Sequence, residues 1–101
     1  EEAMREGDKA VYTAVGALGR KEFIEAYESL EAARDAFRRA GADVEEARSQ
    51  TLENVYGYIR AEMERNDKLK KLIRLKEIVE KKKALKLQDD IAERTLGDGS
   101  D

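Results

Sequence analysis

Histidine, cysteine, proline and tryptophan are absent from this chain of 101 residues. Without histidine, the sequence offers no imidazole base, no serine–histidine or cysteine–histidine nucleophile pair and no common zinc site. Without cysteine, it offers no disulfide, thiolate or iron–sulfur ligand. Because proline would break most helices, its absence favours a helical chain. No apolar run approaches the roughly 20 residues that a membrane-spanning helix requires.

The sequence also lacks the motifs that carry enzyme chemistry. It contains no Ser-x-x-Lys motif and no glycine-rich phosphate loop after a strand-like segment. Most of its acidic side chains lie opposite the apolar stripes of the predicted helices, where carboxylates are solvated. We therefore expect a protein that is not an enzyme, with no catalytic residue, no metal site and no cofactor.

Charge is abundant and unevenly distributed. Charged residues make up 43% of the chain and apolar residues 41%, a composition typical of helical proteins with charged outer faces. The formal net charge of −3 hides an acidic body over residues 1–64, a basic segment over 65–86 and an acidic end over 87–101. This segmentation is the main organisational feature of the sequence.

Apolar residues recur at helical spacing along four segments. The second segment is the clearest, with an apolar face that begins at Phe23 and ends at Ala40. In the first segment, Met4, Val11, Val15 and Leu18 share one face. The predicted helices cover residues 3–18, 21–40, 44–65 and 68–95, within a single domain over 1–96, and residues 97–101 are predicted to form a flexible acidic tail.

Glycine and capping residues suggest where these helices begin and end. Gly19 and Gly41 are natural C-terminal cap residues, and Asp43 starts an Asp-x-x-Glu capping pattern. Asn66 and Asp67 predict an end and a restart, with Asp67 as the N-cap of the last helix, although one continuous helix through both is the alternative. Gly57 interrupts the third helix, which indicates a close approach of another group.

Connections of two or three residues favour antiparallel neighbours. The predicted fold class is all-α, either an antiparallel four-helix bundle or a stack of helical hairpins. The C-terminal helix is the longest, and we expect it to extend beyond the others.

The last helix carries an apolar stripe that changes direction near Lys82. One straight helix cannot bury both halves of this stripe against one flat partner. Either the helix breaks near residue 82, or its halves pack against different surfaces. We therefore predict a protein-interaction or oligomerisation module, of coiled-coil or scaffold type, whose partner is a second copy of the chain or another helical protein. The predicted interface residues are Leu75, Ile78, Leu85, Leu87, Ile91 and Leu96.

The basic segment supports an alternative function, which is binding of RNA or DNA through residues 68–86. The segment has no aromatic residue for base stacking, and the rest of the chain is acidic. The predicted polyanion contacts are Lys70, Lys71, Arg74, Lys81, Lys82, Lys83 and Lys86.

Tyr12 and Tyr58 lie away from the predicted apolar faces. They are candidate interface anchors if exposed, and the alternatives are singly exposed aromatics or a wider core. A cytoplasmic location is expected, because neither a signal peptide nor a membrane-spanning segment is recognisable.

Overall fold

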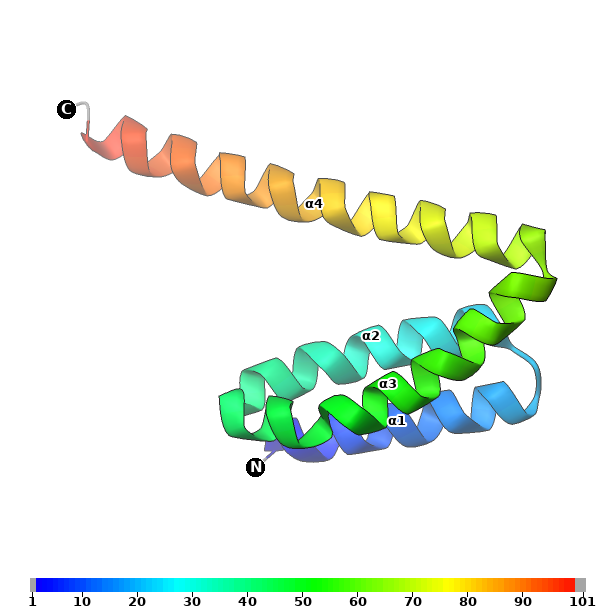
Figure 1. Ribbon diagram of the computed structural model, residues 1–101. Helices are drawn as coiled ribbons and strands as arrows, with labels where there is room; N and C mark the ends of the chain where they lie inside the picture. Colours follow the sequence, from blue (N-terminus) through cyan, green and yellow to red (C-terminus); the bar gives the residue numbers. More distant parts are fainter. Residues whose placement is uncertain (1, 100–101) are drawn as a thin grey trace. The chain divides into compact units, whose positions relative to one another are not determined.

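The computed structural model describes the backbone of residues 2–99 and the side chains of residues 2–88. Over this range the protein is all-α and contains no strand. Its helices are α1 (Glu2–Gly19), α2 (Phe23–Ala40), α3 (Ala42–Arg65) and α4 (Asp67–Gly99) (Figure 1). Two compact units divide the chain, Glu1–Lys70 and Lys71–Asp101. The single domain predicted over residues 1–96 stays a prediction.

Helix α2 provides the largest share of the core of the first unit. Its buried residues follow the predicted 3–4 spacing, so they line one side of the helix. They are Ala26, Tyr27, Leu30, Ala33, Ala36 and Phe37. Helix α2 packs most extensively on α1 and also packs on α3, which contributes Leu52, Val55 and Ile59 to the core.

Helix α1 faces α2 with small residues rather than with its large apolar ones. Gly7, Ala14 and Ala17 are buried, and Ala10 continues the same row at a spacing of three and four residues. The predicted stripe was wrong for Val15, whose side chain is 51% exposed. Small side chains let two helices approach closely, and the large residues of α2 then fill the space.

Gly7 makes the closest of these approaches. A Cβ atom placed on Gly7 would lie 2.6 Å from Cδ1 and 2.8 Å from Cζ of Phe37, and would also overlap Cε1. Because Phe37 is fully buried, its ring occupies the space that any side chain at position 7 would need. Gly57 is different, since no described atom lies within 4 Å of a Cβ placed there, so the close approach predicted at Gly57 was wrong.

Some helix ends differ from those that the glycine and capping residues predicted. The residue with left-handed backbone between α1 and α2 is Lys21 (φ 61°) and not Gly19, so α2 begins two residues later than predicted. Gly41 (φ 120°) ends α2, as predicted from its freedom to adopt positive φ. Since α3 begins at Ala42, Asp43 lies inside its first turn and is not the N-cap.

The predicted interruption between α3 and α4 is confirmed. Asn66 has an extended backbone (φ −136°, ψ 93°), and its side-chain Oδ1 accepts a hydrogen bond of 3.1 Å from the Leu69 N–H. Asn66 is therefore the N-cap of α4, one residue before the predicted Asp67.

Helix α4 is continuous through Lys81, Lys82 and Lys83. Of the two alternatives for the shifted stripe, the break near residue 82 is therefore wrong. The helix also includes residues 97–99, which were assigned to the tail from the sequence.

Candidate functional site: the exposed face of α4

The second unit presents a row of large apolar side chains to solvent. Leu75 and Leu85 are each 57% exposed, and Ile78 is 50% exposed. At about 100° per residue, these three positions fall within about 80° of one another around the helix. Leu75, Ile78 and Leu85 therefore form an exposed apolar row, which Lys82 interrupts on the same face.

Two further residues widen this row. Leu72 is 43% exposed and Val79 is 48% exposed, and both lie on one flank of the row. The sequence spacing alone gave no signal that these two side chains are exposed. We use the name α4 stripe for Leu72, Leu75, Ile78, Val79 and Leu85.

Not all predicted interface residues share this face. Leu87, which is 62% exposed, follows Leu85 by two positions and therefore projects to the opposite side of the helix. The side chains of Ile91 and Leu96 lie outside the described residues.

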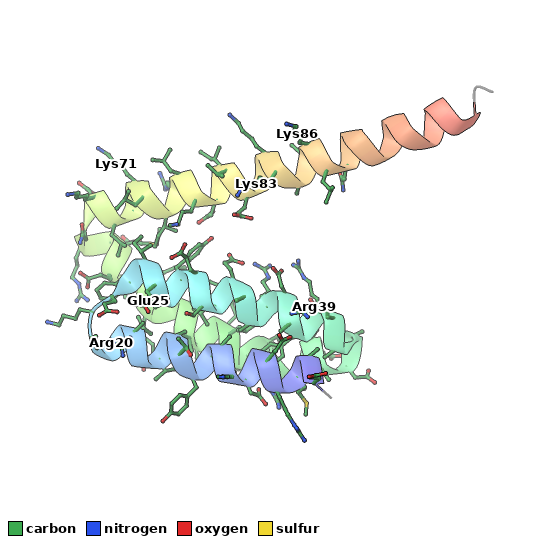
Figure 2. The ribbon with its side chains drawn as sticks, turned by 180° about the vertical axis from the view of Figure 1, so that it is seen from behind. Arg20, Glu25, Arg39, Lys71, Lys83 and Lys86 are labelled. Carbon is green, nitrogen blue, oxygen red and sulfur yellow. The ribbon has the colours of Figure 1, made fainter. Side chains whose placement is uncertain are left out.

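The predicted polyanion contacts surround α4 rather than line one side of it. Lys70, Arg74 and Lys81 follow one row, whereas Lys83 and Lys86 lie on other sides. Lys71, Lys83 and Lys86 are spaced along the helix in Figure 2. Lys83 lies 3.9 Å from the carboxylate of Glu80, one turn earlier, in an exposed ion pair. The basic side chains are thus distributed around the helix, and Lys82 and Lys86 lie among the residues of the α4 stripe.

A second candidate surface lies within the first unit. A hollow of about 700 Å³ opens between the C-terminal ends of α1 and α3 and the start of α2. Val15, Leu18, Phe23 and Val55 supply its apolar lining, with Tyr58, Glu62, Arg65, Lys21 and Gly19 completing the wall. Tyr12 and Tyr58 are 82% and 69% exposed, so they are not part of a wider core, while their role as anchors stays a prediction.

Several exposed ion pairs link side chains on the surface of the first unit. Arg48 donates two hydrogen bonds to the Asp8 carboxylate, at 2.9 and 3.3 Å, and links α3 to α1. These bonds raise the pKa of Arg48, and its guanidinium also lies 5.8 Å from the Phe37 ring centroid. At the turn between α1 and α2, Arg20 lies 3.9 Å from Glu25 (Figure 2). Exposed pairs of this kind orient helices but stabilise them little.

Tyr56 is the one described residue whose ionisation the fold shifts strongly. Burial of the phenol raises its pKa to about 12, and the nearby Glu31 carboxylate acts in the same direction. Its ring packs edge-on against Tyr27, with centroids 6.1 Å apart. The hydroxyl has no hydrogen-bond partner among the described side chains. Tyr56 is thus a half-buried phenol that stays neutral at physiological pH, with the Glu31 carboxylate nearby.

Among the described residues, no three acidic side chains come together in a group that could hold a metal ion. Within the same range, no helix has both the length and the apolar character needed to cross a membrane. Comparison with family models, curated proteins and solved structures finds no match for this chain.

Proposed function

We propose that this protein is a non-catalytic association module that forms a homodimer through the α4 stripe. The observation that carries the proposal is the row of half-exposed side chains on an unbroken helix. Covering the exposed half of each of these side chains contributes about 0.8–1.5 kcal/mol, before the entropy cost of association. A second copy of α4 supplies a row of the same length and chemistry.

We also propose that α1 and α2 pack as an antiparallel pair and that α4 is the longest helix. Gly7, near the start of α1, meets Phe37, near the end of α2, and Arg39 lies 3.2 Å from Glu6. These contacts support an antiparallel α1–α2 pair. At about 1.5 Å per residue, the 33 residues of α4 span roughly 50 Å, against roughly 36 Å for the 24 residues of α3. This length supports a C-terminal helix that extends beyond the others.

The test replaces two residues of the α4 stripe with charged ones. We expect the Leu75→Glu/Leu85→Glu variant to be a monomer with wild-type helical content, while the wild-type protein is a dimer by light scattering. The matched control is Ala84→Glu/Leu87→Glu, which adds the same two charges outside the stripe and keeps the dimer. A stripe variant that stays dimeric would place the interface elsewhere.

Binding of RNA or DNA through residues 68–86 is the second candidate, supported by the row of Lys70, Arg74 and Lys81 on α4. It predicts binding that weakens steeply as salt rises and is lost in the Lys81→Glu/Lys82→Glu/Lys83→Glu variant. Fluorescence anisotropy with short RNA and DNA duplexes at about 50 mM salt measures it. No binding under that condition would eliminate this candidate.

A further inference from the structure

We infer that the hollow between the C-terminal ends of α1 and α3 binds a small amphipathic carboxylate, whose apolar body covers Val15, Leu18 and Val55 and whose carboxylate pairs with Lys21. The hollow and all its lining residues belong to the first unit, so this site does not depend on the proposed homodimer. Three features of the hollow support it, which are its apolar lining, the charge at its edge and the backbone conformation of Lys21.

The lining of the hollow suits the apolar part of a small molecule. Val55 is buried and Leu18 and Phe23 are half-buried, while Val15 and Tyr58 are largely exposed. The hollow therefore has an apolar floor and an apolar side that solvent reaches. Its volume of about 700 Å³ lies within the usual range of ligand-binding cavities, which are lined by apolar and aromatic side chains with few polar groups.

The charged residues of the lining favour an anion. They are two cations, Lys21 and Arg65, and one carboxylate, Glu62. Arg65 lies 3.0 Å from Glu62 in an ion pair, whereas the Lys21 amine forms no ion pair with a carboxylate of residues 2–88. Lys21 therefore gives the hollow a net positive charge within an otherwise acidic body over residues 1–64. The complementary ligand carries one negative charge beside its apolar part.

Lys21 occupies a backbone position at which glycine is normally found. Its N–H donates to the Leu18 carbonyl at 3.0 Å, and the Glu22 N–H donates to the Ala17 carbonyl at 2.9 Å. These are the two hydrogen bonds of a Schellman helix end, with Lys21 as the left-handed residue (φ 61°). Glycine adopts this conformation without the steric cost that a side chain brings. Strain of this kind is typical of functional positions, and the Lys21 side chain lines the hollow.

Three probes that share a straight alkyl chain test the chemistry of the ligand. At pH 7 octanoate is an anion, 1-octanol is neutral and octylammonium is a cation. In NMR titrations of the full chain at about 50 mM salt, we expect octanoate to bind about fivefold more tightly than octanol, and octylammonium to bind most weakly. The chemical-shift changes should gather at the amides of Val15, Leu18 and Val55. Equal binding of the three probes, no binding of octanoate, or shifts gathered on the α4 stripe would overturn the inference.

The substitution Lys21→Gly separates binding from folding. Because glycine relieves the left-handed strain, we expect Lys21→Gly to raise the Tm by about 2–6 °C, while its affinity for octanoate falls about fivefold, to that for octanol. The matched control is Lys9→Ala, which removes a positive charge from α1 outside the hollow and should leave octanoate binding unchanged. Unchanged octanoate binding in Lys21→Gly, or a Tm below that of the wild type, would overturn the inference.

A variant of the other unit shows that this site and the proposed dimer interface are separate. The Leu75→Glu/Leu85→Glu variant should bind octanoate as the wild type does, because the hollow lies in the first unit. Loss of octanoate binding in that variant would place the site on α4 and overturn the inference. A wild-type chain that is monomeric would overturn the proposed function and leave the site in the hollow standing.

Discussion

The contact between Gly7 and Phe37 makes the substitution Gly7→Ala a sharp test of how α1 packs on α2. An alanine in a helix is normally favoured over glycine by about 1 kcal/mol. At this position the added methyl group would overlap three atoms of the Phe37 ring. The ring is fully buried and lies beneath the Arg48 guanidinium, so it has little room to move.

The magnitude follows from these two opposing effects. Inserting a methyl group into a packed core costs about 1–3 kcal/mol, and three overlapping ring atoms place this case near the upper end. After subtraction of the helix-propensity gain, we expect Gly7→Ala to destabilise the protein by about 1–2 kcal/mol. For a domain of this size, that corresponds to a fall in Tm of roughly 5–10 °C.

Thermal unfolding followed by circular dichroism measures the effect, and the chain supplies its own control. Gly57 is also inside a helix, but no described atom lies near a Cβ placed there, so Gly57→Ala should raise the Tm. Replacing the ring removes the clash, so Gly7→Ala should be neutral or stabilising in a Phe37→Leu background. If Gly7→Ala raised the Tm of the wild-type protein as Gly57→Ala does, the close approach of α1 and α2 would be refuted.

Two further predictions concern the helix cap and the buried phenol. Asn66→Ala should destabilise the first turn of α4 by about 1 kcal/mol and speed hydrogen exchange at the Leu69 amide. Asn66→Asp, the control, should keep the cap. An unchanged exchange rate at Leu69 in Asn66→Ala would contradict the assigned cap. Because the folded pKa of Tyr56 is raised to about 12 from an unfolded value of 10.0, its contribution to stability is complete below pH 10 and is lost as the pH rises through 12. The loss should be about 1–2 kcal/mol, since the phenol is only partly buried. Comparing unfolding at pH 9 and above pH 11 in wild type and Tyr56→Phe measures it, and an equal loss in both proteins would contradict the shift.

The sequence alone predicted the helices because their apolar patterns are local. The face of α2 that contains Tyr27, Leu30 and Phe37 is buried as its spacing indicated. The restart after Asn66 was also visible, because Asn and Asp are strong capping residues. The Asp43 pattern failed because Gly41, with its positive φ, allows α3 to begin one residue before that aspartate.

Other features were not predictable from local pattern. The contact of Gly7 with Phe37 joins residues 30 positions apart, and glycine gives no apolar signal of its own. The exposure of Leu72 and Val79 depends on what covers α4, which spacing cannot reveal. By contrast, the opposed directions of Leu85 and Leu87 already follow from the predicted helix over 68–95, because two positions along a helix turn by about 200°.

The central claim is that the α4 stripe joins two copies of this chain. Its most direct test is the solution mass of the wild-type protein by light scattering, at two protein concentrations and in about 50 and about 500 mM salt. An apolar interface is not screened by salt, so we predict a dimer in both buffers at the higher concentration. A monomer under all four conditions would contradict the claim.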